Sequence, residues 1–186
     1  MLFHETPISG AYVIEPQRIH DDRGFFARLW CADELSRQEL CTTIRQTNIG
    51  VSTRKGTLRG LHFQRAPHAE VKVVRCPRGA IFDVIVDLRA DSPTFRRWYG
   101  VELSQDNQLA LYVPEGCATG YLTLTDDTEI YYHTSAAFHP ASASGVRYDD
   151  PAFGIAWPGP ALVMSEQDRS WPDFHLQQGE QRDHRR

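Results

Sequence analysis

The sequence has no long apolar run and no recognisable export segment. No stretch of its 186 residues approaches the roughly 20 consecutive apolar residues that a transmembrane helix requires. The first ten residues, MLFHETPISG, contain no basic segment followed by an apolar one, so no signal peptide is expected. With 41% hydrophobic residues and a formal net charge of −4, residues 1–186 are predicted to form a single cytoplasmic domain.

Paired cysteines and nucleotide-binding motifs are also missing. The four cysteines stand singly, which favours reduced thiols over a disulfide framework or a structural zinc site. A P-loop, a Gly-x-Gly-x-x-Gly turn and a Gly-x-Ser-x-Gly elbow are all absent. Because the pI is near 6.0, a dedicated nucleic-acid binder is not expected either.

The acidic average conceals one basic segment. Residues 16–80 contain twelve Lys or Arg against six Asp or Glu, whereas the rest of the chain contains 8 basic and 18 acidic residues. Basic residues gathered in this way could form an anion site inside an otherwise acidic protein. A solvated basic face is the alternative interpretation.

Short segments rich in β-branched and aromatic residues, separated by turn residues, run along most of the chain. One segment only, Ala32–Leu40, has a helical pattern. Many short strands at close spacing predict an all-β sandwich or barrel with few, short helices. The polar C-terminal residues, from about 176, are expected to form a frayed tail. The ten predicted strands are Gly10–Glu15, Gly24–Trp30, Cys41–Ser52, Leu58–Gln64, Val71–Cys76, Ala80–Leu88, Trp98–Ser104, Leu109–Val113, Gly120–Leu124 and Glu129–Thr134.

Strict alternation along the predicted strand Leu58–Gln64 places His62 on one face and Arg59 on the other. Gly60 shares the face of His62 and would leave room there for a ligand, although a structural histidine is the alternative. A cupin-type metal centre would need a His-x-His pair, but residue 64 is Gln. No metal is therefore predicted.

Three further residues could carry chemistry. Lys72 is one of only two lysines among 20 basic residues, and its compact ammonium could lie against a developing oxyanion. An edge-strand lysine that discourages aggregation is the alternative. Tyr132 shares a predicted face with Ile130, while Tyr131 faces away, so its phenol is either a general acid or part of the core. Asp168 lies on a predicted loop and is uninformative alone.

Eight segments taken together identify a protein family more specifically than any of these single residues does. They are DDRGFF (21–26), QTN (46–48), GTLRGLHFQ (56–64), RGAIFDVIVDLR (78–89), SPTFRRW (92–98), VPEG (113–116), DDPAFGIAWP (149–158) and SEQD (165–168). In this order, over nearly the whole chain, they resemble the dTDP-4-dehydrorhamnose 3,5-epimerase family. The resemblance implies a metal-free, cupin-like double-stranded β-helix (a jelly-roll barrel), usually homodimeric, that acts on a nucleotide-linked 4-keto-6-deoxyhexose and involves neither nucleic acid nor membrane.

The resemblance also implies roles for individual residues. His62 matches the general base and Asp168 its carboxylate partner, while Tyr132 matches the general acid and Lys72 the lysine beside the C4 carbonyl. The implied substrate-binding residues are Arg23, Phe26, Arg28, Gln46, Asn48, Arg59, Thr119, Phe138 and Gln167. Protons at C3 and C5 of such a sugar are acidic because each lies α to the C4 ketone, so a base, an acid and an oxyanion stabiliser suit the reaction.

Four positions depart from the family pattern. Arg28 and Ala143 stand where the family usually has Glu, Thr119 where it has His, and Gln167 where it has Lys. These departures favour a related but non-standard nucleotide sugar, or inversion of one carbon only. The expected reaction is inversion of C3 and/or C5 of a nucleotide-linked 4-keto-6-deoxyhexose, with dTDP as the expected nucleotide, in deoxysugar biosynthesis. A mono-epimerase, a 3,4-ketoisomerase and a non-catalytic sugar-binding barrel are the alternatives.

Overall fold

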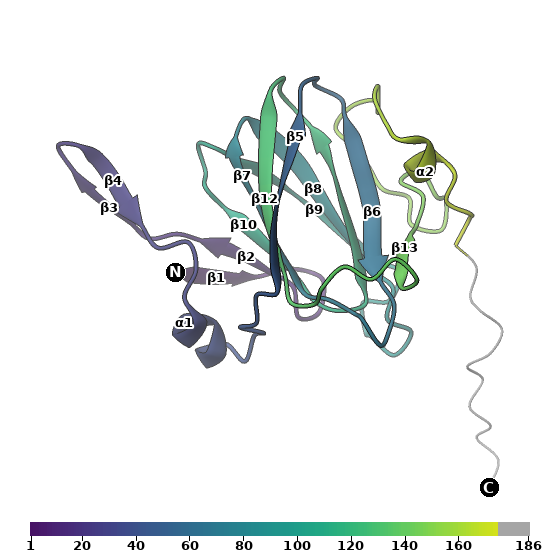
Figure 1. Ribbon diagram of the computed structural model, residues 1–186, viewed down its shortest axis with the longest axis horizontal. Coiled ribbons are helices and arrows are strands. Elements are labelled where there is room, and N and C mark those ends of the chain that lie inside the picture. Colours follow the sequence, from purple (N-terminus) through teal and green to yellow (C-terminus); the bar gives the residue numbers. More distant parts are fainter. Residues whose placement is uncertain (175–186) are drawn as a thin grey trace, which may run out of the picture.

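The computed structural model describes residues 1–174, and the polar tail predicted from about 176 lies outside the described residues. Two antiparallel sheets face each other and form a barrel (Figure 1). The six-stranded sheet has the order β1 (Leu2–Glu5), β2 (Tyr12–Glu15), β10 (Ala110–Val113), β7 (Lys72–Arg78), β12 (Thr128–Thr134), β5 (Gln46–Ser52). The five-stranded sheet has the order β13 (Ala143–Gly145), β6 (Leu58–Gln64), β11 (Cys117–Thr123), β8 (Ala80–Asp87), β9 (Trp98–Ser104). The predicted all-β, cupin-like barrel is confirmed.

Strands β3 (Arg18–Asp21) and β4 (Gly24–Ala27) form a separate two-stranded hairpin. Figure 1 shows this hairpin projecting away from the barrel, beyond the short helix α1 (Ala32–Arg37). Three of its apolar side chains are exposed: Ile19 (68%), Phe25 (48%) and Phe26 (70%). The hairpin therefore carries an apolar surface that no other part of residues 1–174 covers.

Strand β8 shows how the period-2 pattern builds the core. Ile81 and Ile85 are buried in the cluster between the two sheets, and the alternate residues Val84 and Val86 are buried on the outer face. The outer face is covered by the later segment 146–157, which is why β8 is apolar on both sides. Each such side chain contributes about 1.5–3 kcal/mol on burial. The predicted division of this strand into two faces is confirmed.

Several predicted boundaries are wrong. Helix α1 ends at Arg37 rather than Leu40, and residues 41–45 precede β5 instead of belonging to it. Strands β1, β3 and β13 were not predicted, because such short segments are extended through pairing with their neighbours and not through local propensity. Asp168 lies in helix α2 (Glu166–Arg169) rather than on a loop, since the Ser165 hydroxyl caps this helix by accepting the Asp168 N–H at 3.1 Å.

The predicted alternation fails at one point in β6. Thr119 of β11 pairs with His62, but Tyr121, only two residues later, pairs with Arg59. Two residues of β6 thus oppose one residue of β11, as in a β-bulge. Because of this extra residue Arg59 and His62 point to the same side of the sheet, and the prediction that they face opposite ways is wrong.

Glycines at the bulge allow the two backbones to meet. Gly60 has φ +133°, and a Cβ placed on it would lie 2.4 Å from the Gly120 Cα. A Cβ on Gly120 would lie 2.7 Å from both the Arg59 carbonyl oxygen and the Gly60 Cα. Backbone atoms cannot rotate away as a side chain can, so neither position accommodates another residue without moving a strand.

We expect Gly120→Ala to lower the free energy of unfolding by about 3 kcal/mol, because the added methyl group would push β6 and β11 apart. Urea unfolding followed by circular dichroism measures the change. Gly159→Ala is the matched control, since a Cβ there meets nothing within 4 Å and should alter stability by less than about 0.5 kcal/mol. Equal unfolding midpoints for the two variants would show that the close approach of the strands is not a constraint.

Candidate active site

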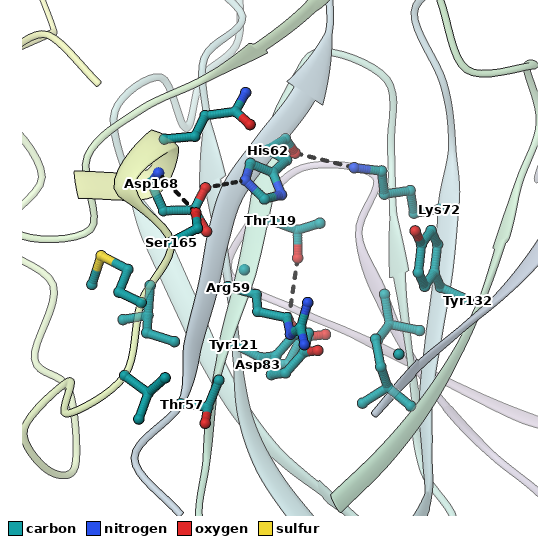
Figure 2. Close-up of a pocket in the computed structure, with 18 of the residues that line it drawn as sticks. Thr57, Arg59, His62, Lys72, Asp83, Thr119, Tyr121, Tyr132, Ser165 and Asp168 are labelled. Atoms are coloured by element: carbon teal, nitrogen blue, oxygen red, sulfur yellow. Dashed lines mark hydrogen bonds and ion pairs between the residues drawn. The ribbon is translucent and has the colours of Figure 1, made fainter. Parts of the chain in front are cut away.

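A cavity of about 570 Å³ opens between the two sheets. Strands β5, β6, β7, β8, β11 and β12 line it, together with residues 163–168 (Figure 2). The structure brings seven of the predicted site residues to this cavity: Arg59, His62, Lys72, Thr119, Tyr132, Gln167 and Asp168. These residues are far apart in the sequence, so the convergence supports the prediction of a single site.

His62 and Asp168 form a hydrogen-bonded pair on one wall. The His62 Nε2 lies 2.6 Å from Asp168 Oδ1, and 43% of the His62 side chain is exposed against 5% of Asp168. Burial favours a higher pKa for the Asp168 carboxyl, but hydrogen bonds from His62, the Gly60 N–H and Ser165 together hold it below its usual value. An ionised Asp168 fixes the tautomer that leaves His62 Nδ1 free to accept a proton.

Lys72 and Tyr132 lie together on the other wall. Figure 2 shows them side by side, across the cavity from Asp168. The Lys72 Nζ donates to the backbone carbonyl of His62 at 3.2 Å and pairs with Glu70 Oε1 at 3.1 Å. Burial raises the pKa of the Tyr132 phenol, and the nearby Glu70 carboxylate raises it further. Tyr132 therefore keeps its proton at neutral pH and can donate it.

Arg59 brings a second cation to the cavity. Its guanidinium donates to the Val51 carbonyl at 3.0 Å and to the Ser52 hydroxyl at 3.3 Å, both on β5. Within residues 1–174 it forms no ion pair with a carboxylate. Since Arg59 and Lys72 both come from the basic segment 16–80, part of that segment does converge on one place that could hold an anion.

Asp83 also lines the cavity, although it was not predicted as a site residue. Its side chain is 1% exposed, and Oδ2 has no hydrogen-bond partner among the described residues. Burial raises the pKa of this carboxyl to about 7, despite a hydrogen bond from Thr119. The signal in the sequence is an acid between two isoleucines, Ile81 and Ile85, on the inner face of β8. Asp83 Oδ2 is thus an unpaired oxygen buried in the wall of the cavity.

Thr119 is held against the wall of the cavity. Its hydroxyl oxygen lies 3.0 Å from the Val84 carbonyl and 3.2 Å from Asp83 Oδ1, and the residue is 7% exposed. A hydroxyl has one proton to donate, so both contacts compete for it. Thr119 therefore shapes the cavity mainly by its small size and by its contact with Asp83.

Three predicted binding residues lie next to the cavity without lining it. Asn48 pairs with Tyr132 across β5 and β12, on the face of β5 that also carries Gly50 of the cavity wall. Gln46 is two residues along the same face, and its side-chain oxygen accepts the Phe138 N–H at 2.5 Å. The Phe138 side chain is 64% exposed. An exposed ring tethered beside the inner face suits a stacking role.

The remaining predicted residues, Arg23, Phe26 and Arg28, do not reach the cavity of their own chain. Arg23 and Phe26 belong to the projecting hairpin, where Arg23 pairs with Asp21. Arg28 pairs with Glu34 of α1 at 2.9 Å. Arg28, which stands where the family usually has Glu, is thus neutralised by Glu34 of the same chain.

Among residues 1–174, no group of three or more His, Cys, Asp or Glu side chains is arranged to hold a metal ion. Over the same residues, no helix has the length and apolar character needed to cross a membrane.

Comparisons with known proteins match this architecture. A family model described as dTDP-4-dehydrorhamnose 3,5-epimerase matches residues 5–175. The dTDP-4-dehydrorhamnose 3,5-epimerase of Sinorhizobium fredii is 42% identical over 175 residues, which cover 94% of this chain and 90% of that protein. The crystal structure of the dTDP-4-dehydrorhamnose 3,5-epimerase from Elizabethkingia anophelis matches with a TM-score of 0.90 and 36% identity, over 94% of this chain and 96% of the other.

A solved relative of different specificity is also similar. A 3'-monoepimerase from Streptomyces bikiniensis, in complex with dTDP-quinovose, matches with a TM-score of 0.84 and 34% identity, over 91% of this chain and 86% of the other. The matches cover nearly the whole chain in sequence and in structure. The resemblance found in the sequence is thereby confirmed, and the chain belongs to the dTDP-4-dehydrorhamnose 3,5-epimerase family.

Proposed function

We propose that this protein is an epimerase that inverts C3 and/or C5 of a dTDP-linked 4-keto-6-deoxyhexose in deoxysugar biosynthesis. The proposal rests on one observation: a proton acceptor and a proton donor lie on opposite walls of the same cavity. A base oriented by a carboxylate, His62 with Asp168, faces a protonated phenol and an ammonium, Tyr132 and Lys72. Removal of a proton from one face of a carbon and its return from the other inverts that carbon.

The chemistry follows from the residue types. His62 Nδ1 removes the proton α to the C4 ketone, and Asp168 stabilises the imidazolium that results. The electron pair of the broken C–H bond moves to the ketone oxygen, where Lys72 stabilises the enolate. Loss of such a donor typically lowers the rate by about 10²–10³. Tyr132 then delivers its proton to the opposite face, and proton exchange with water restores both side chains. This cycle needs no cofactor.

Two residues of the site and one similar protein support a substrate that carries a nucleotide. Arg59, with no carboxylate partner among residues 1–174, is available to a diphosphate. The exposed Phe138 ring offers a face on which a base could stack. A similar enzyme from Streptomyces bikiniensis was solved with a dTDP sugar.

Deuterium incorporation distinguishes the possible reactions. We expect incubation with dTDP-4-keto-6-deoxyglucose in D₂O to place deuterium at C3, at C5 or at both, because each abstracted proton is replaced from solvent. NMR of the product reads the positions. Deuterium at both carbons supports the double epimerase, and deuterium at one carbon supports the mono-epimerase. A ketone at C3 would indicate a ketoisomerase, and binding without any exchange would contradict the proposal in favour of a sugar-binding barrel.

We expect His62→Ala to lower kcat by about 10²–10⁴, since it removes the general base, while the protein remains folded. Steady-state assays and circular dichroism measure the two effects. His4→Ala is the matched control, because His4 lies on β1 in an exposed pair with Glu15, outside the cavity lining. Wild-type turnover by His62→Ala would overturn the assignment of the base.

We further propose that the protein is a homodimer in which the β3–β4 hairpin of each chain covers the cavity of its partner. This arrangement would bring Arg23 and Phe26, which do not reach the cavity of their own chain, to a substrate. Two exposed apolar surfaces support it, namely the hairpin and the outer face of β5 and β12. The latter carries Ile49 (57% exposed), Val51 (50%) and Tyr131 (45%).

The four free cysteines support a location in the cytoplasm, where thiols stay reduced.

Mixing two inactive variants tests this exchange. If each site uses the barrel of one chain and the hairpin of the other, a dimer of His62→Ala with Arg23→Ala contains one site with both wild-type residues. We expect co-expressed, doubly tagged heterodimers to regain activity that neither homodimer has. Sedimentation confirms the dimer, and absence of recovery in a purified heterodimer would show that Arg23 does not act on the partner.

A further inference from the structure

One largely buried carboxylate, that of Glu70, is paired with Lys72 but does not itself line the cavity. Glu70 precedes β7, and its Oε1 lies 3.1 Å from the Lys72 Nζ. Only 9% of the Glu70 side chain and 12% of the Lys72 side chain are exposed. A pair shielded from water in this way is screened less by salt and fixes its members more firmly than a surface pair.

The carboxylate of Glu70 is itself held in place. Its Oε2 accepts a hydrogen bond from Gln64 Nε2 at 3.0 Å. Gln64 is 3% exposed and is anchored through its side-chain oxygen, which accepts the His139 N–H at 2.6 Å. The same Nε2 also lies within 3.0 Å of the His68 carbonyl. Glu70 is therefore oriented by Gln64 of β6, and contacts with two loops hold Gln64 in place independently of any ligand.

This arrangement directs the Lys72 ammonium. An ammonium has three protons to donate. One is used by Glu70 and a second by the backbone carbonyl of His62 at 3.2 Å. Because Lys72 lines the cavity, the third remains for a ligand. Without Glu70, the flexible side chain would retain one protein acceptor and could rotate away from that direction.

We propose that Glu70 is a positioning residue for this reaction, which aims the ammonium of Lys72 at the substrate. The inference rests on the proposed epimerase function. Glu70 acts through Lys72, without touching the substrate itself.

The effect on Tyr132 is electrostatic. Burial raises the pKa of the phenol most, the negative charge of Glu70 raises it further, and Arg59 opposes the shift. Removal of the Glu70 charge should therefore lower the pKa of Tyr132, so that its proton is lost at lower pH. The other ionisable groups that line the same cavity are His62 and Arg59 on β6, Lys72 on β7, Asp83 on β8, Tyr121 on β11 and Asp168 on α2.

Kinetics of Glu70→Gln test the proposal. We expect kcat to fall about tenfold with less than a twofold change in KM, because a misplaced donor weakens the transition state more than the bound substrate. The alkaline limb of the pH–rate profile should move to lower pH. Glu70→Asp keeps the charge and should retain the wild-type limb, and it also serves if Glu70→Gln fails to fold. Wild-type kcat and an unmoved limb in Glu70→Gln would overturn the proposal.

Glu129→Gln is the matched control. Glu129 lies three residues before Tyr132 on β12, but it pairs with Arg78 at 3.4 Å and does not line the cavity. Its neutralisation should leave both kcat and the alkaline limb unchanged. An equal shift of the limb in both variants would show a general charge effect and would contradict a specific role for Glu70.

NMR provides a readout that does not depend on activity. The chain has only two lysines, so isotope-labelled lysine gives signals from Lys72 and from Lys55, an exposed internal reference. We expect Glu70→Gln to increase the mobility of the Lys72 ammonium and to leave Lys55 unchanged. Labelled tyrosine, identified with Tyr132→Phe, should show ionisation of Tyr132 at lower pH. Failure of wild-type turnover alone would refute the proposed function, whereas unchanged lysine and tyrosine signals would refute the role of Glu70.

Discussion

The backbones of β6 and β11 approach so closely at Gly60 and Gly120 that no side chain fits between them. The extra residue at this contact turns Arg59 and His62 to the same side of the sheet. It also directs the Gly60 N–H to the carboxylate of Asp168 at 3.2 Å, which ties helix α2 to the strand. Arg59, the proposed base His62 and its carboxylate partner Asp168 thus depend on one local distortion of the barrel.

The two walls of the cavity differ in their electrostatic environment. On one wall, hydrogen bonds keep a buried carboxylate ionised beside His62. On the other, burial and a negative neighbour keep Tyr132 protonated. Groups whose environments favour opposite protonation states can act as base and acid at a single pH. This difference supports the proposed roles of His62 as base and Tyr132 as acid.

The sequence was sufficient for the features that depend on regular alternation, and insufficient for those that depend on exceptions to it. The two faces of β8 follow from a period of two, and so does the position of Tyr132 in the cavity. The prediction put Arg59 on the wrong face of β6, because strict alternation holds only for a strand without bulges. Asp168 was placed on a loop although Ser165 caps a helix there. The contacts of Glu70 depend on residues distant in the sequence, so no local pattern could reveal them.

The unpaired carboxyl of Asp83 gives the wall of the cavity a charge that depends on pH. With a pKa raised to about 7, this buried carboxyl is partly protonated under neutral conditions. An anion that enters the cavity disfavours the ionised form and raises the pKa further, so binding takes up a fraction of a proton. In calorimetric terms, the observed enthalpy of binding would depend on the ionisation enthalpy of the buffer, and affinity for an anionic ligand would weaken as the pH rises.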